Sequence, residues 1–293
     1  MRIGVHTSIA GALANAAHRA QAIGCDGFQM FSANPRGWRA APPSEAGCET
    51  FRQVRAGFRL APVAIHANYL INLASSDPAV RDLSVAAFRA ELQRALALGA
   101  DYVVIHPGSA RDGERAPAVR RMVESLAKAA DGLHLSGLTL LVENTAGQGA
   151  VLGASLEELA ELLAGAARVM PAGVCLDTAH LFAAGYAIHT ARGLTETVRL
   201  MESTVGVKNV RLIHANDSKT ALASHVDRHE HIGKGGIGLD AFRRIVRHPK
   251  LRRIPFICET PIDKPNDDRR NLRVLRKLSD LEQACLDCHS EDP

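Results

Sequence analysis

Several features that would place this chain in a particular class of protein are missing from its 293 residues. No run of 18 or more apolar residues occurs, so we expect no membrane-spanning helix. The segment from Met1 to His6 enters a strand directly and lacks the apolar stretch and cleavage site of a signal peptide, which indicates an intracellular, cytoplasmic protein. A net charge of +4 permits nucleic-acid binding but is equally typical of metabolic enzymes.

The six cysteines do not suggest a disulfide framework. Cys175 and Cys258 lie inside predicted strands, where a free cysteine behaves as a small apolar side chain. Cys285, Cys288 and His289 match the short pattern for covalent haem attachment. We reject haem because this pattern lies in a polar tail and the chain has no export signal, and the sequence indicates no role for the tail.

Apolar runs that read as buried parallel strands recur along the chain, at about residues 2–6, 26–31, 62–66, 101–106, 138–143, 172–177, 209–214 and 254–259. Helical segments are predicted at about 11–22, 44–57, 78–98, 155–165, 191–204 and 267–278. This alternation predicts a (β/α)8 TIM barrel as a single domain over residues 1–280, followed by a polar C-terminal tail, 281–293. One long insertion, about 215–238, is expected to be irregular and functional.

Most of these predicted strands end in a side chain that can bind a metal ion. The C-terminal ends of barrel strands lie on one face, so the pattern predicts one shared site there. The turn after the sixth strand adds a further histidine, and the insertion adds an aspartate and a histidine that alternate on one side of an extended segment. The nine candidate ligands are His66, His106, Glu143, Asp177, His180, His214, Asp227, His229 and Glu259.

Mixed imidazole and carboxylate ligands suit zinc or manganese. Nine groups are too many for one ion and fit a cluster of two or three ions with a bridging carboxylate. Each residue alone has an ordinary explanation as a hydrogen-bonded, capping or ion-paired side chain, but those explanations would all have to hold together. Such a cluster suits the hydrolysis of a phosphate ester, and the chain shows no Ser-His-Asp arrangement or Walker-type loop. Five further histidines are predicted to lie at the surface: His18, His134, His189, His248 and His289.

The chain resembles the endonuclease IV family of apurinic/apyrimidinic endonucleases over about residues 1–280. The resemblance rests on Gly11-Ala-Leu-Ala-Asn15, Asn34-Pro-Arg-Gly-Trp-Arg39, His66-Ala-Asn-Tyr-Leu-Ile-Asn72, His106-Pro-Gly-Ser109, Glu143-Asn-Thr-Ala-Gly-Gln-Gly149, Gly173-Val-Cys-Leu-Asp-Thr-Ala-His180, His214-Ala-Asn-Asp-Ser-Lys219 and Asp227-Arg-His-Glu-His-Ile-Gly-Lys-Gly235. The Leu-Asp-Thr strand end and the Asp-Arg-His loop are the most specific of these motifs.

The resemblance implies a zinc-dependent enzyme of base excision repair that hydrolyses the phosphodiester 5′ to an abasic site and also clears 3′-blocking groups. It implies three zinc ions, with manganese able to replace one. The first ion would be held by His66, His106 and Glu143, the second by Glu143, Asp177, His214 and Glu259, and the third by His180, Asp227 and His229. Glu143 would bridge two ions and be the catalytic carboxylate.

The resemblance further implies a monomer that binds double-stranded DNA at the nucleoid. Arg36 resembles the residue that enters the minor groove, and Tyr69 and Leu70 resemble the side chains that wedge into the base stack. Two residues in these loops differ from the pattern of the family. Gly37 replaces a larger polar residue that helps fill the gap left by a flipped nucleotide, and Asn68 replaces a serine.

Three other interpretations are open. The first is a metal-dependent sugar isomerase or epimerase on a related barrel, which would not need the third ligand set formed by His180, Asp227 and His229. The second is a hydrolase of small phosphate esters, and the third is a DNA-binding barrel without catalysis.

Overall fold

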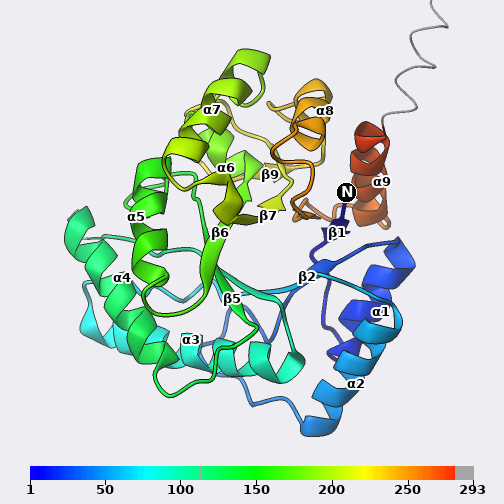
Figure 1. Ribbon diagram of the computed structural model, residues 1–293. Helices are drawn as coiled ribbons and strands as arrows, with labels where there is room; N and C mark the ends of the chain where they lie inside the picture. The colour runs from blue at the N-terminus through cyan, green and yellow to red at the C-terminus, as the bar shows by residue number, and fades with distance from the viewer. Residues whose placement is uncertain (112–113, 281–293) are drawn as a thin grey trace, which may run out of the picture.

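A closed ring of parallel strands forms the centre of the molecule, with helices around it (Figure 1). The computed structural model describes residues 1–111 and 114–280, so the predicted tail 281–293, with Cys285, Cys288 and His289, lies outside the described residues. The strands are hydrogen-bonded in the order β1-β10-β7-β6-β5-β4-β3-β2. Their bounds are β1 Ile3–Val5, β2 Phe28–Phe31, β3 Val63–His66, β4 Tyr102–Ile105, β5 Thr139–Glu143, β6 Ala172–Asp177, β7 Val210–His214 and β10 Phe256–Cys258.

The two ends of this strand order meet where β1 and β2 lie side by side. A bridge joins His6 to Gln29, and the Thr7 amide donates to the Gln29 carbonyl at 2.7 Å. The backbones approach so closely that a Cβ on Gly4 would lie 1.9 Å from the carbonyl oxygen of Gly27. Glycine is therefore needed at this crossing, and the predicted TIM barrel is confirmed.

The helices cover the outside of the barrel (Figure 1). Their bounds are α1 Ala14–Ile23, α2 Glu45–Gly57, α3 Pro78–Leu98, α4 Arg115–Ala130, α5 Leu156–Ala166, α6 Thr178–Ala183, α7 Ala191–Ser203, α8 Leu239–Arg247 and α9 Asp267–Ser279, with a 3-10 turn at Val207–Asn209. No helix among the described residues is long and apolar enough to cross a membrane.

Helix α4 was not predicted. Its buried residues include Ala118, Met122 and Leu126, spaced by four as on one face of a helix. Pro117 interrupts this pattern in the sequence. In the structure it occupies the third helical position, in the first turn, where a backbone N–H has no partner within the helix.

The barrel interior contains a layer of apolar side chains, made by Ala64, Val104, Leu141, Cys175, Leu212 and Ile257. Each of these residues lies two positions before a candidate ligand, which is at the end of the same strand or directly after it. Residues two apart in a strand point to the same face. The strand-end ligands therefore form the next layer of the interior, at the C-terminal end of the barrel.

The insertion after β7 is irregular over most of its length, as predicted, and contains one short hairpin. Residues β8 Asp217–Ser218 and β9 His229–Glu230 pair as a short antiparallel hairpin. Asp217 is fully buried, and its carboxylate accepts the backbone N–H groups of Ser218, Gly233, Gly235, Ile237 and Gly238 at 2.8 to 3.1 Å. This single side chain replaces much of the backbone pairing that a longer sheet would supply.

Candidate metal centre

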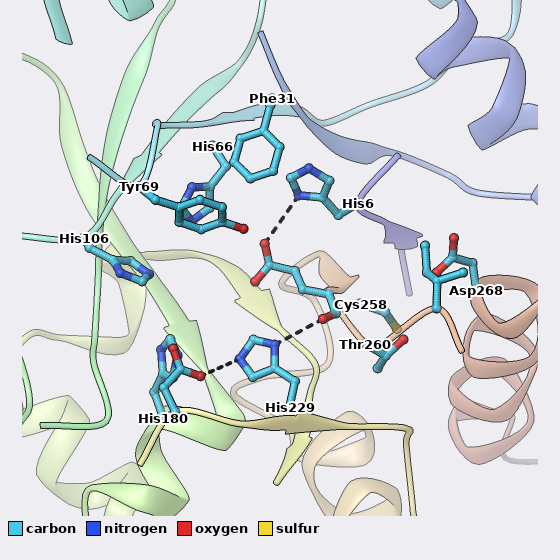
Figure 2. A pocket seen from close by; sticks show the side chains of 13 residues that line it. His6, Phe31, His66, Tyr69, His106, His180, His229, Cys258, Thr260 and Asp268 are labelled. Atoms are coloured by element: carbon cyan, nitrogen blue, oxygen red, sulfur yellow. Dashed lines mark hydrogen bonds and ion pairs between the residues drawn. The ribbon is translucent and has the colours of Figure 1, made fainter. Parts of the chain in front are cut away.

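A solvent-accessible pocket of about 350 Å³ lies at the C-terminal ends of the strands. Figure 2 shows the imidazoles of His66, His106, His180 and His229 around it, with Tyr69 beside His66. Asp227 and Glu259 also line it, whereas Glu143, Asp177 and His214 are fully buried behind these residues. The structure thus brings all nine candidate ligands to one place.

Glu143, at the end of β5, contacts ligands from three other strands. One of its oxygens, Oε2, lies 3.2 Å from His66 Nε2 and 3.2 Å from His106 Nε2. The other, Oε1, lies 2.9 Å from His214 Nδ1. Two groups with metal-binding geometry share this carboxylate: His66, His106 and Glu143 form one, and Glu143, Asp177, His214 and Glu259 form the other.

A third group consists of Asp177, His180 and His229. Asp177 ends β6 and caps α6 by accepting the backbone N–H of His180 at 2.9 Å, so the turn between these two residues is a helix start. Asp227 completes the surroundings. Its carboxylate oxygens lie 3.1 Å from His180 Nε2 and 3.3 Å from His229 Nε2.

The donors of this third group fit a bound cation. His180 Nε2 and His229 Nε2 are buried and make no hydrogen bond among the described residues, although carboxylates surround them. A buried nitrogen left in that way is costly, and coordination would satisfy it. The Nδ1 atoms of these two rings lie 2.9 Å from the Asn144 carbonyl and 3.1 Å from the Glu259 carbonyl, which would leave Nε2 for an ion.

The acids and histidines shift each other's ionisation. Burial opposes the charge on Glu143, but His214 and His106 hold the pKa of this carboxyl well below its usual range. Burial would lower the pKa of His180, but Asp177 and Asp227 outweigh it and raise this pKa to about 10. The pKa of Asp227 falls to about 2, chiefly because His180 overcomes the effect of burial. At neutral pH the Glu143 and Asp227 carboxylates are therefore ionised, and His180 carries a proton.

Comparison with known proteins identifies the family. Residues 17–278 match a family described as a xylose isomerase-like TIM barrel. The chain is 51% identical to the probable endonuclease 4 of Solibacter usitatus, over 95% of this chain and 97% of that protein. It is 40% identical to the endonuclease IV of Thermus thermophilus, whose crystal structure superposes with a TM-score of 0.85 over 97% of this chain and 100% of that one. The chain belongs to the endonuclease IV family.

A D-tagatose 3-epimerase-like protein also superposes on this endonuclease IV family member, with a TM-score of 0.69, over 98% of this chain and 100% of that chain. The two chains are 19% identical, so this likeness shows the fold alone. It gives no support to the alternative of a sugar isomerase or epimerase.

In this endonuclease IV family member, binding of an ion to the group that contains His180 should release a proton. His180, with a pKa of about 10, carries a proton at pH 7 that an ion must displace. Apparent affinity should therefore rise about tenfold per pH unit until about pH 10. Calorimetry in two buffers of different ionisation enthalpy measures the proton count, and equal heats in both would contradict the expectation.

The same pKa has a consequence for stability without metal. The raised pKa of His180 stabilises the folded chain below the ordinary imidazole value of 6.5, and this contribution is lost as the pH rises through about 10. Without metal, denaturant midpoints should therefore fall between these two pH values. A His180→Gln variant, which cannot take up the proton, should lose this part of the pH dependence.

The two loops that resemble DNA-reading elements of endonuclease IV lie together at the rim. Arg36 is exposed, and Tyr69 is 63% exposed. Asn68 joins the loops, since its side-chain amide donates to the Gly37 carbonyl while its Oδ1 accepts the Leu70 N–H at 2.7 Å. The Tyr69 N–H also donates to the Pro35 carbonyl at 3.3 Å. The departures at Gly37 and Asn68 are thus in direct contact.

Sequence reasoning missed several polar residues of the site. Asn216 donates to Asp177 at 2.7 Å and accepts the Glu259 N–H at 2.8 Å, and Asn144 accepts the Asp177 N–H at 2.6 Å. Both lie inside motifs of the endonuclease IV resemblance, next to predicted ligands. His6 and Gln29 also reach the site, and neither was counted among the candidate ligands.

His189, predicted to lie at the surface, is partly buried. The His189 ring packs at 5.3 Å against Phe182, and its Nδ1 is buried without a hydrogen-bond partner among the described residues. The loop between α6 and α7 contacts α5 and α8, since the Leu156 N–H donates to the Tyr186 hydroxyl at 2.9 Å and Arg244 donates to the His189 carbonyl at 2.6 Å, which a single sequence does not reveal.

Proposed function

We propose that this chain hydrolyses the phosphodiester bond 5′ to abasic sites in double-stranded DNA, leaving a 3′-hydroxyl and a 5′-deoxyribose phosphate. Removal of 3′-blocking groups would use the same site. The observation that carries this proposal is the convergence of nine imidazole and carboxylate ligands in one pocket. The 51% identity to a probable endonuclease 4 supports it.

Three zinc ions are the proposed cofactors, with manganese possible at one position. His66, His106 and Glu143 would hold one ion, and Glu143, Asp177, His214 and Glu259 a second. His180, Asp227 and His229 would hold the third, with Asp177 also within reach of His229. Such ions supply a water that is acidic near neutral pH and positive charge for the phosphate oxygens.

The protein's own groups prepare this site. Glu143 is held ionised in the buried floor, so it can bridge two cations without first losing a proton. Asn144 and Asn216 make three hydrogen bonds with Asp177, and Asn216 accepts a fourth from the backbone N–H of Glu259. These bonds limit the movement of Asp177 and Glu259. A rigid set of ligands reduces the reorganisation needed when a phosphate enters.

The exposed loops would select the substrate. An abasic nucleotide has no base to unpair or unstack, so it enters a pocket beside the duplex at the least cost. Arg36 would enter the minor groove, while Tyr69 and Leu70 would wedge into the base stack. Ring contacts of Tyr69 with Phe31 at 5.2 Å and with His66 at 6.2 Å support this proposal. We further propose that the protein acts as a monomer at the nucleoid and that residues 1–280 form its catalytic domain.

The test uses a labelled duplex that carries one tetrahydrofuran abasic analogue, beside an undamaged duplex. The analogue cannot undergo β-elimination, so a product that a polymerase extends from its 3′ end reports hydrolysis 5′ of the lesion. Metal content is measured on the same sample, with about three ions per chain expected. A fully loaded protein that leaves the analogue intact would refute the proposal and direct attention to small phosphate esters.

Replacing Tyr69 with alanine should weaken binding of the abasic duplex about tenfold. Stacking of an aromatic ring on a base contributes roughly 1 to 3 kcal/mol, and Tyr69 is exposed enough to reach one. The ion count should not change, since Tyr69 lies outside the candidate ligand groups. Fluorescence anisotropy with abasic and intact duplexes measures the effect. Phe58→Ala, at an exposed aromatic that ends helix α2, is the matched control.

A further inference from the structure

Gln29 is a fully buried polar residue in the middle of β2, within the layer of the barrel interior that holds the ligands. It lies two positions after Gly27, as each strand-end ligand lies two positions after an apolar interior residue. The structure places it next to three site residues that come from three other strand ends: His6, His214 and Glu259.

The side-chain amide of Gln29 makes three of the four hydrogen bonds open to it at this place. Its Oε1 lies 2.9 Å from His214 Nε2. Its Nε2 donates to Glu259 Oε1 and lies 3.0 Å from His6 Nδ1. The reverse orientation would set the amide oxygen against the Glu259 carboxylate, so the partners fix which end of the amide faces which residue.

We propose that Gln29 is a positioning residue for the metal centre. With Oε1 as the acceptor, His214 carries its hydrogen on Nε2 and keeps the Nδ1 lone pair free. Nδ1 is the atom that faces Glu143 at 2.9 Å and Glu259 at 3.1 Å, within the second ligand group. The bond to Glu259 Oε1 leaves the other oxygen, Oε2, on the side of His214. Gln29 thus aims two ligands at the same point.

The contact with His6 extends this arrangement across the barrel closure. His6 Nδ1 accepts from Gln29, and the ring packs on Phe31 with a centroid distance of 4.5 Å. Gln29 is also bridged to His6 through the backbone. The Gln29 side chain is therefore held where β1 and β2 pair, and a shift of this side chain would disturb that pairing.

The inference rests on the proposed metal centre and not on the DNA substrate. Its test compares Gln29→Met and Gln29→Glu with the wild-type chain. Methionine keeps the length but removes all three hydrogen bonds, whereas glutamate keeps the acceptor for His214 and places a carboxylate against Glu259. Met30→Leu is the matched control, because Met30 is equally buried on the same strand and packs in the main core away from the ligands.

The measurement is zinc affinity by competition with a chelator, together with the ion count per chain and the thermal midpoint. Both Gln29 variants should lose one ion about 10 to 100 times more readily, as is usual for such supporting residues. The remaining ions and the Met30→Leu variant should behave as the wild type. Unchanged affinity for every ion in Gln29→Met would overturn the inference, as would an equal loss in Met30→Leu.

Failure of the function and failure of this inference are separable. A wild-type chain that binds its ions but leaves abasic DNA intact would remove the proposed function, while the comparison of zinc affinities would still decide the role of Gln29. A wild-type chain that binds no ions would overturn both. Cleavage of abasic DNA with equal zinc affinities would overturn the role of Gln29 alone.

Discussion

Glu143→Gln should abolish cleavage of abasic DNA and leave binding of that DNA in place. Glutamine has almost the same shape, but it carries no charge and offers one oxygen where the carboxylate offers two to His66, His106 and His214. Since Glu143 belongs to two ligand groups, the variant should hold fewer ions. A loss of several kcal/mol of transition-state stabilisation should lower the cleavage rate about 10³-fold or more.

The experiment measures single-turnover cleavage, duplex binding and metal content on the same preparation. Glu124→Gln, which makes the same chemical change at an exposed position on α4, should leave all three unchanged. A Glu143→Gln variant that cleaves at a near wild-type rate would show that this carboxylate is structural. Loss of DNA binding together with cleavage would point to an altered fold.

Asp217→Asn should destabilise the protein more than any other conservative change described above. The carboxylate accepts five backbone N–H groups, and asparagine replaces one accepting oxygen with a donor. At least two buried N–H groups would lose their partner, at about 1 to 3 kcal/mol each. We expect a loss of roughly 4 kcal/mol in the free energy of unfolding, or about 10 °C in the thermal midpoint.

The same change should reduce activity from a distance. Asp227 and His229 lie between Asp217 and the backbone N–H groups that donate to its carboxylate. If this segment shifted, both side chains would move away from His180. Asp240→Asn is the matched control, because Asp240 is an exposed aspartate at the start of α8, just after that segment. Thermal unfolding and cleavage that are unchanged in Asp217→Asn would contradict this account.

The sequence predicted those site residues whose side-chain direction depends only on their position in a strand. A residue such as Glu143 follows an apolar run and falls two positions after an interior residue, so its direction follows from strand geometry. The barrel itself follows from the same alternation of strands and helices. Gly27 and Gln29 obey the two-residue rule as well, but a glycine gives no apolar signal, and Gln29 lies within its strand instead of at its end.

Other features depend on contacts between distant segments, and a single sequence does not show these. The bond from Asn68 to Gly37 connects two loops whose separate sequences give no sign of each other. The hairpin of the insertion is similar, because its strands have two residues each and depend on Asp217 for their shape. Short elements like these have weak intrinsic preferences, so tertiary contacts decide them.

The pairing of β1 with β10 sets a condition on when the site can exist during synthesis. The first strand to leave the ribosome hydrogen-bonds to the last one, in the register Val5 with Cys258. Gln29, near the start of the chain, likewise cannot form its hydrogen bond to Glu259 until Glu259 has been synthesised. A nascent chain that has reached β7 holds most of the ligands but can neither close the barrel nor complete the second group. The candidate metal centre is therefore among the last features of the molecule to form, and a growing chain cannot complete it before β10 and Glu259 have been made.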